Sequence, residues 1–346
     1  MNQTQLVRNT ENLGYLPNSS FVNLDETAKF TTGHNVLGQI NYATEAIDPQ
    51  VSSGHPVLSV QMTDSTLDGF AEFWTTPRPV ESGEHDGICY AHDGEYFLCA
   101  GRIPQAQEYA KATESAYVTA LDLITTLDYT NCFRMWNFVN QINDANSDGL
   151  EIYRDFCLGR ANAFERFKFN ETEVPAATGI GSLGGGIAFY FLTCRSSVPT
   201  TIENPQQMSA YHYPKRYGPK SPKFARATHL MPANTLGQAG HVYVSGTASI
   251  TGHETRFHRD IEKQTHLALE NIGRVVNAAN LSAYELANGY DLSDLNNVKV
   301  YVRHRDDIPQ VREICEQALS PTADVRYLNV DICRSDLLVE IEGIVN

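Results

Sequence analysis

The sequence lacks the features that define several large classes of protein. No apolar run approaches the length of a membrane span, and residues 1–14 are polar, without the hydrophobic core of a signal peptide. Basic residues are few: 26 Lys and Arg stand against 41 Asp and Glu, a formal net charge of -15. Because phosphate backbones bind to basic surfaces, nucleic acid is not an expected partner. We expect a cytoplasmic protein that binds neither membranes nor nucleic acid.

Cysteine is also scarce, and its spacing suits neither a disulfide framework nor a zinc site. The seven cysteines are odd in number and include no Cys-x-x-Cys pair, which is typical of free thiols in a reducing compartment. His253, Glu254 and His258 span one residue more than the H-E-x-x-H motif, so the two histidines would not face one metal ion. We expect no metal, and no residue pattern indicates a cofactor.

Nucleotide and nucleophile motifs are absent or misplaced. The sequence has no Walker loop and no G-x-S-x-G elbow. Gly179, Gly181 and Gly184 match the G-x-G-x-x-G spacing, but an apolar strand follows them where a dinucleotide site requires a helix. These glycines indicate turns before a strand.

One order of elements occurs twice in the chain. Apolar runs and helical spacing predict strand, helix, strand, helix, strand over residues 95–194 and again over 241–345. The predicted helices are 107–128 and 150–167 in the first copy and 257–280 and 308–319 in the second. A repeat of this size favours an internally duplicated α/β unit over one doubly wound sheet, and 346 residues suit two domains.

The remaining segments complete a division into four parts. Residues 1–56 are polar and rich in turn residues, and we expect a lead-in that wraps the first domain, 57–196. The second domain is 241–346. Between the domains, 197–240 is rich in Pro, Tyr and Arg and has no periodicity, which is typical of a functional connection.

The final segment, 325–345, is predicted to be a hairpin that carries two acidic residues in its second apolar run. Alternation places Glu340 and Glu342 on one face of that strand, and Cys333 lies in the turn. On residue type alone, the glutamates would be solvated and the cysteine a small buried residue. A functional face therefore needs support from the rest of the chain.

Arginine and tyrosine provide that support. Guanidinium groups bind carboxylates bidentately, and tyrosine hydroxyls orient them without adding charge. One arginine is more often part of a surface ion pair, but several in aromatic surroundings indicate a substrate with more than one carboxylate. The residues concerned are Tyr153, Arg154 and Arg160 on a predicted helix and Tyr211, Tyr217 and Arg226 in the connection.

Several ordered motifs from residue 95 onwards resemble the chorismatase family. They include Met135-Trp136-Asn137-Phe138, Tyr153-Arg154-Asp155-Phe156-Cys157, Pro175-Ala176-Ala177-Thr178-Gly179, Ser209-Ala210-Tyr211 and Phe224-Ala225-Arg226-Ala227. The C-terminal half is similar to the YjgF/RidA fold. The resemblance implies an α/β (α+β) protein of two RidA/chorismate-mutase-like domains, each a mixed sheet packed by helices on one face. The lead-in carries none of it.

The resemblance implies an enzyme that releases pyruvate from chorismate, whose ring carboxylate and enolpyruvyl carboxylate suit the arginines. Glu340 occupies the position of the family's catalytic glutamate and would protonate the methylene carbon of the enol ether. That role requires a pKa raised by a desolvated pocket or by a carboxylate neighbour. The resemblance does not assign each arginine to one carboxylate.

Family members differ in their product, and Gly246 and Cys333 resemble the hydroxybenzoate-forming type. Gly246 would let the substrate ring sit differently, and Cys333 would assist a proton shift. A glycine that permits a bulge and a cysteine that merely packs are the ordinary alternatives. We predict 3-hydroxybenzoate, with or without 4-hydroxybenzoate. A chorismate hydrolase that gives a dihydroxycyclohexadiene carboxylate is the alternative.

Two other function classes stay open. A RidA-like imine hydrolase would not need residues 211–227, and a non-catalytic binding module for an aromatic acid would tolerate the loss of Glu340. The oligomeric state is open as well. RidA-like domains commonly build trimers, whereas a duplicated chain can supply both faces of a site as a monomer.

Overall fold

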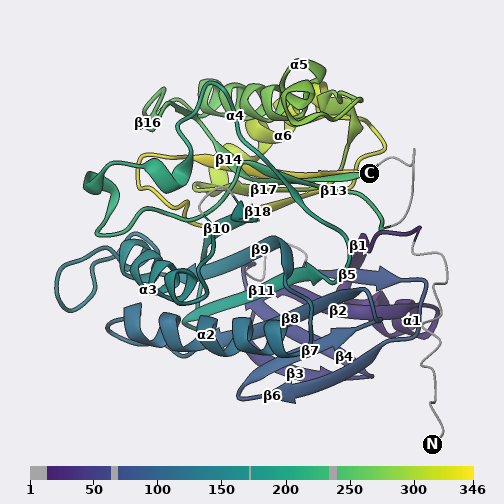
Figure 1. Cartoon of the computed structure of the whole chain (residues 1–346). Coiled ribbons are helices and arrows are strands. Elements are labelled where there is room, and N and C mark those ends of the chain that lie inside the picture. The colour runs from purple at the N-terminus through teal and green to yellow at the C-terminus, as the bar shows by residue number, and fades with distance from the viewer. Residues whose placement is uncertain (1–13, 64–68, 171–172, 234–239) are drawn as a thin grey trace, which may run out of the picture.

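The computed structural model describes residues 14–63, 69–170, 173–233 and 240–346 (Figure 1). Of the polar N-terminal stretch 1–14, only Gly14 lies within these ranges. Across the described ranges, no helix is long and apolar enough to cross a membrane.

The first half of the chain contains a six-stranded mixed sheet with helices α2 and α3 on one face. Its strand order is β10-β9-β11-β8-β7-β6, in which β10 is parallel to β9 and the other neighbours are antiparallel. The elements are β6 (Glu81–His85), β7 (Ile88–His92), β8 (Tyr96–Ile103), α2 (Ala110–Thr126), β9 (Asn131–Asn140), α3 (Ile152–Arg166), β10 (Ala176–Ser182) and β11 (Ile187–Cys194).

The second half contains another six-stranded sheet, in the order β12-β13-β14-β19-β17-β18, with helices α4 and α6 on one face. The elements are β12 (Thr200–Ile202), β13 (Ala227–Leu230), β14 (His241–Ala248), β15 (Ile250–Thr251), β16 (Glu254–Thr255), α4 (Ile261–Val276), α5 (Ala278–Leu281), β17 (Leu295–Val302), α6 (Ile308–Ala318), β18 (Val325–Asn329) and β19 (Val339–Val345). Strands β15 and β16 pair only with each other in the described chain.

The two halves share one topology. The order β10-β9-β11-β8 in the first sheet corresponds to β18-β17-β19-β14 in the second, with one parallel pair and two antiparallel pairs in each. The predicted duplication of an α/β unit is therefore confirmed, as are mixed sheets with helices on one face. The predicted final hairpin is wrong, because β17 lies between β18 and β19 and pairs with both.

Strands β1 to β5 form a third, five-stranded sheet in the order β1-β5-β2-β4-β3. Its elements are β1 (Asn18–Asn23), α1 (Thr27–Thr32), β2 (Asn35–Ala43), β3 (Ile47–Ser52), β4 (His55–Gln61) and β5 (Phe70–Thr76). The segment expected as a lead-in thus contains β1, β2, β3 and the start of β4. Its polar appearance has a physical cause, since β3 is largely exposed.

Helices cover the outer faces of the two larger sheets, and their inner faces meet in a shared core (Figure 1). Alternation along β8 shows how one strand serves both sides: Tyr96 and Leu98 join the shared core, whereas Phe97 and Cys99 pack under α2 and α3. In α2, buried Tyr117, Ala120, Leu121 and Ile124 follow helical spacing. The shared core also receives residues of the N-terminal sheet, so the three sheets are packed together.

Strand β10 lies at the edge of the first sheet, and its outer edge is hydrogen-bonded to the second half of the chain. The backbone N–H groups of Ala176 and Ala177 donate to the hydroxyls of Thr228 and Ser245, each at 2.9 Å. The N–H of Gly181 donates to the Asp331 carbonyl at 2.8 Å, and an added Cβ at Gly181 would lie 2.6 Å from that oxygen. Close backbone packing, not cofactor binding, accounts for this glycine of the G-x-G-x-x-G match.

Candidate active site

A cavity lies where α3, the connection 197–240, β14 and the start of β19 converge. Most of the residues singled out in the sequence line it together: Tyr153, Arg154, Arg160, Tyr217, Arg226, Gly246, Cys333 and Glu340. Tyr211 is not among the lining residues. Its ring packs on that of His212 at 4.7 Å, and its carbonyl accepts a hydrogen bond from Ser221.

Glu340 is a buried acid at the wall of this cavity. It lies on β19, opposite Ala248 of β14 and Tyr301 of β17, and its side chain is only 3% exposed. Burial, followed by the negative charge of Glu342, raises the pKa of Glu340 to about 8. At neutral pH this side chain is therefore mainly a neutral acid that can donate a proton.

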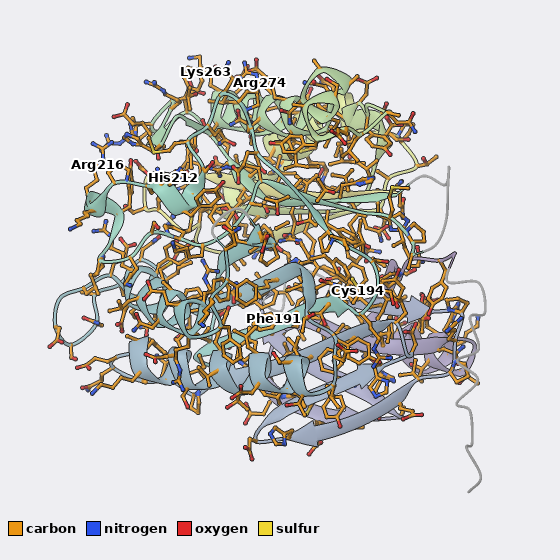
Figure 2. The ribbon with its side chains drawn as sticks, viewed as in Figure 1. Phe191, Cys194, His212, Arg216, Lys263 and Arg274 are labelled. Carbon is orange, nitrogen blue, oxygen red and sulfur yellow. The ribbon has the colours of Figure 1, made fainter. Side chains whose placement is uncertain are left out.

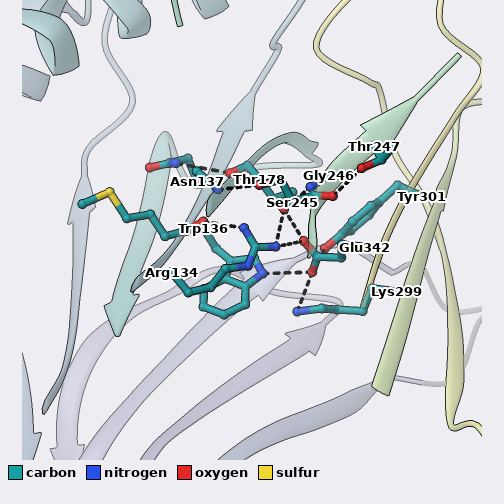
Figure 3. A network of polar contacts seen from close by, with 12 residues as sticks. Arg134, Trp136, Asn137, Thr178, Ser245, Gly246, Thr247, Lys299, Tyr301 and Glu342 are labelled. Atoms are coloured by element: carbon teal, nitrogen blue, oxygen red, sulfur yellow. Dashed lines mark hydrogen bonds and ion pairs between the residues drawn. The ribbon is translucent and has the colours of Figure 1, made fainter. Parts of the chain in front are cut away.

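Glu342 lies two residues further along the same strand face, in a network of donors (Figure 3). Its carboxylate pairs with Arg134 at 2.5 Å and Lys299 at 2.9 Å. Burial alone would raise the pKa of Glu342, but Lys299 and Arg134 hold it at about 2. Three uncharged side chains also donate to this carboxylate: Trp136 at 2.9 Å, Tyr301 at 3.0 Å, and the hydroxyl of Thr178. The two neighbouring glutamates therefore differ in protonation because only one has close cationic partners.

Gly246 lies directly against the acid. The pairing of β14 with β19 shifts register between Val244 and Thr247, and this irregularity turns the Gly246 N–H to the Thr178 hydroxyl at 3.0 Å. A Cβ added at Gly246 would lie 1.9 Å from Oε1 of Glu340. The glycine therefore makes room for the acid itself, which sequence reasoning did not foresee.

Cys333 is the other residue singled out for its effect on the product. Its thiol donates to Oε2 of Glu340 at 3.8 Å. Burial, and then the charge of Glu340, raises the pKa of the Cys333 thiol well above its usual value. Cys333 is therefore a neutral thiol that touches the acid.

Two buried arginines face the cavity. Arg160 is 1% exposed; its guanidinium lies over the Phe156 ring at 5.1 Å, and its Nε and Nη2 have no hydrogen-bond partner. Arg226 is 3% exposed and donates to the Tyr213 hydroxyl at 2.8 Å and to the Met208 carbonyl at 2.9 Å. Its Nε forms no hydrogen bond but lies 4.0 Å from Oε2 of Glu203, in an ion pair. Buried N–H groups of this kind are suited to bind carboxylates.

Two more arginines lie on the cavity wall with their own partners. Arg154 forms an ion pair with Glu151 at 3.5 Å. Arg334, which sequence reasoning missed, stacks over the ring of Tyr217 at 4.2 Å and donates to the His253 carbonyl at 2.9 Å. The cavity is therefore cationic although the whole chain is acidic.

The irregular connection forms one wall of the cavity. It contains the short 3-10 helices Ala210–His212 and Lys215–Tyr217, and the Tyr217 hydroxyl donates to the His253 carbonyl at 2.7 Å. Arg216 and His212 project at one end of the molecule (Figure 2), where Arg216 pairs with Glu254 at 3.1 Å. The predicted functional role of this segment fits its position.

The described residues contain no group of three or more His, Cys, Asp or Glu side chains able to hold a metal ion. A neutral carboxylic acid faces a cavity lined by guanidinium groups, an arrangement suited to proton transfer to an anionic substrate.

Comparisons with known proteins cover most of the chain. Residues 72–193 match the family model "Chorismatase FkbO/Hyg5-like, N-terminal", and residues 232–346 match the family model "Endoribonuclease L-PSP". The second match agrees with the resemblance of the C-terminal half to the YjgF/RidA fold.

Two relatives and one solved structure align over nearly the whole length. A 3-hydroxybenzoate synthase of Streptomyces hygroscopicus is 55% identical over 313 residues, which is 90% of this chain and 92% of the relative. A chorismatase of Streptomyces rapamycinicus is 46% identical over 310 residues, 90% of this chain and 92% of that protein. The crystal structure of a chorismatase superposes with a TM-score of 0.92 at 42% identity and covers 96% of this chain and 98% of that one.

Proposed function

The chain belongs to the chorismatase family, and from this we propose that it releases pyruvate from chorismate and forms 3-hydroxybenzoate. The observation that carries the chemistry is the neutral acid Glu340 beside a cavity lined by arginines. The two relatives that match 90% of the chain are named 3-hydroxybenzoate synthase and chorismatase, so neither an imine hydrolase nor a binding module is favoured.

We assign the first step to Glu340. The π electrons of the enol ether take the proton at the terminal methylene carbon as the O–H bond of Glu340 breaks. This leaves an oxocarbenium-like centre beside the substrate's own carboxylate and the newly ionised Glu340, both of which stabilise positive charge. Arg160 and Arg226 are the proposed partners of the substrate carboxylates, with Tyr153, Arg154 and Tyr217 as further substrate-binding residues. Tyr211 lies outside the cavity lining and is not proposed to contact the substrate.

The second step determines which product forms. The ring hydroxyl oxygen attacks the carbon that bears the ether, the ring C–O bond breaks, and pyruvate leaves as the ketone. The hydroxyl proton returns to Glu340. One C–O bond of the arene-oxide-like intermediate then breaks, a ring carbon loses its proton, and the ring oxygen takes up a proton to give 3-hydroxybenzoate. Pyruvate and 3-hydroxybenzoate together contain the atoms of chorismate, so no water is consumed. We propose that Cys333 assists the proton shift during opening, since its thiol touches Glu340.

The direct test is incubation of the purified protein with chorismate, following pyruvate and separating aromatic products by chromatography. Pyruvate and 3-hydroxybenzoate in equal amounts are expected. Pyruvate with a dihydrodiol would overturn the product assignment and keep the protonation step. Absence of pyruvate would overturn the proposed function.

Replacement of Arg160 by methionine should raise KM for chorismate about tenfold to a hundredfold, because a hydrogen bond to a charged group contributes about 1.5–3 kcal/mol. Methionine keeps much of the packing on Phe156. Arg274→Met is the matched control, since Arg274 lies on the outer face of α4 (Figure 2) in an exposed pair with Glu270. An unchanged KM in Arg160→Met would remove Arg160 from the binding site.

The dependence on pH follows from the acid role. Because the protonated form of Glu340 is the active one and its pKa is raised to about 8, kcat/KM should be level below that pH. Above it, the rate constant should fall about tenfold per pH unit. Steady-state rates from pH 6 to 10 test this. A rate that instead rises through pH 8 would indicate that ionised Glu340 acts as a base.

Three coarser features complete the proposal. All seven cysteines are free thiols, which supports the cytoplasm as the compartment. A monomer and a trimer are the two proposed oligomeric states. We keep 57–196 and 241–346 as the two domains that the connection 197–240 links.

A further inference from the structure

A carboxylate of the N-terminal sheet reaches the charged network behind the acid. Glu72 lies on β5 and is buried. Its oxygens accept hydrogen bonds from the hydroxyls of Tyr42 and Tyr190, both at 2.9 Å, and from Ser19 at 3.3 Å. A salt bridge of 2.7 Å joins Glu72 to Nζ of Lys299. Donors from several elements thus converge on one buried carboxylate.

Lys299 links this carboxylate to the active site. Its Nζ lies 2.7 Å from Glu72 and 2.9 Å from Glu342, and all three side chains are 2% exposed. Arg134 binds the other oxygen of Glu342. The buried row Glu72, Lys299, Glu342, Arg134 therefore contains two negative and two positive charges, and its charge is balanced.

We propose that Glu72 is a positioning residue for the reaction: it balances Lys299, so that Glu342 presents its negative charge to Glu340 and keeps that acid protonated. The inference rests on the proposed function of Glu340. It assigns to the N-terminal sheet a part in catalysis without contact with the substrate.

The physical argument concerns the charges that surround Glu340. On its own strand Glu342 favours the protonated form of Glu340, whereas Arg134 on β9 and Arg226 in the connection favour the ionised form. The neutral thiol of Cys333 and the phenol of Tyr153 on α3 also interact with Glu340, and Tyr301 lies opposite it on β17. Removal of the Glu72 charge would leave one uncompensated cation in the row. An excess of positive charge stabilises ionised Glu340 and lowers its pKa, so Glu340 would lose its proton at a lower pH.

The test is the pH profile of kcat/KM for chorismate in Glu72→Gln, which removes the charge and keeps the shape. We expect the alkaline part of the profile, where kcat/KM falls (the basic limb), to shift to lower pH by about one unit. At the acidic end of the profile, kcat/KM should be near that of the wild type. Tyr190→Phe is the matched control, since it removes a hydrogen bond to the same carboxylate without a change of charge. Its basic limb should stay within about 0.3 pH unit of the wild type.

Lys299→Met tests the same balance with the opposite sign and covers the case in which Glu72→Gln does not fold. Here the row keeps an excess negative charge, and the basic limb should move to higher pH. If Glu72→Gln has the wild-type profile, or if Lys299→Met moves the limb downwards, the positioning role is wrong. If the wild type releases no pyruvate, the proposed function fails before this inference is tested.

Discussion

Glu340→Gln is expected to lower kcat for pyruvate release by at least about a hundredfold, the usual scale for loss of a general acid. Glutamine has nearly the same shape, but its amide cannot give up a proton to carbon at neutral pH. Since the proposed partners of the substrate carboxylates are arginines, binding should remain. Titration calorimetry with the variant and single-turnover measurements of pyruvate separate the two effects.

Glu340→Asp is the informative companion. It keeps an acid but withdraws it by one methylene group, so part of the lost rate should return, with a value between those of glutamine and glutamate. If Glu340→Gln turned over chorismate at nearly the normal rate, another group would have to deliver the proton. Cys333, which touches Oε2 of Glu340, would then be the first residue to substitute.

Gly246→Ala should also lose most of the turnover, by about tenfold or more, because the new methyl group would lie 1.9 Å from Oε1 of Glu340. The buried carboxyl group must move aside, and a general acid acts only within hydrogen-bonding reach of its target. Rates of pyruvate release and product ratios should be measured together. This expectation replaces the one drawn from sequence, in which Gly246 affected only how the substrate ring sits.

A matched control and a rescue variant sharpen this test. Gly273→Ala on α4 adds a methyl group whose nearest neighbour is Leu292 at 3.8 Å, so its rate should be unchanged. The double variant Gly246→Ala, Glu340→Asp shortens the acid and should turn over faster than Gly246→Ala alone. A wild-type rate with an altered product mixture in Gly246→Ala would instead support a role in product choice.

The sequence predicted the two α/β units because their helices carry regular apolar stripes and their strands are buried runs. It did not predict the N-terminal sheet, since the exposed residues of β3 and the turn residues between the strands resemble a loop. The prediction of a final hairpin was wrong for a topological reason. Adjacent apolar runs suggested direct pairing, whereas β17, formed earlier in the chain, lies between them.

The cavity was easier to predict than the network behind it. Arginine and tyrosine motifs marked the cavity, and only Tyr211 lies outside its lining. The partners of Glu342 left no such signal, since Arg134 is 208 positions away, and Lys299 and Glu72 are separated by 227. Alternation placed Glu340 and Glu342 on one face. Only the packing of the three sheets places two cations beside Glu342 and none close to Glu340.

The common strand order of the two halves affects how this site can change under mutation. In an assembly of identical subunits, every substitution occurs in all subunits, so a change that improves one side of a site also alters the equivalent position of every other subunit. Here β19 carries the acid, whereas the corresponding strand β11 carries only Ile, Ala, Phe, Tyr, Leu, Thr and Cys. Because both copies lie in one gene, Thr178 and Arg134 of the first half can vary independently of their counterparts in the second. One copy is thereby free to specialise as a support for the acid of the other.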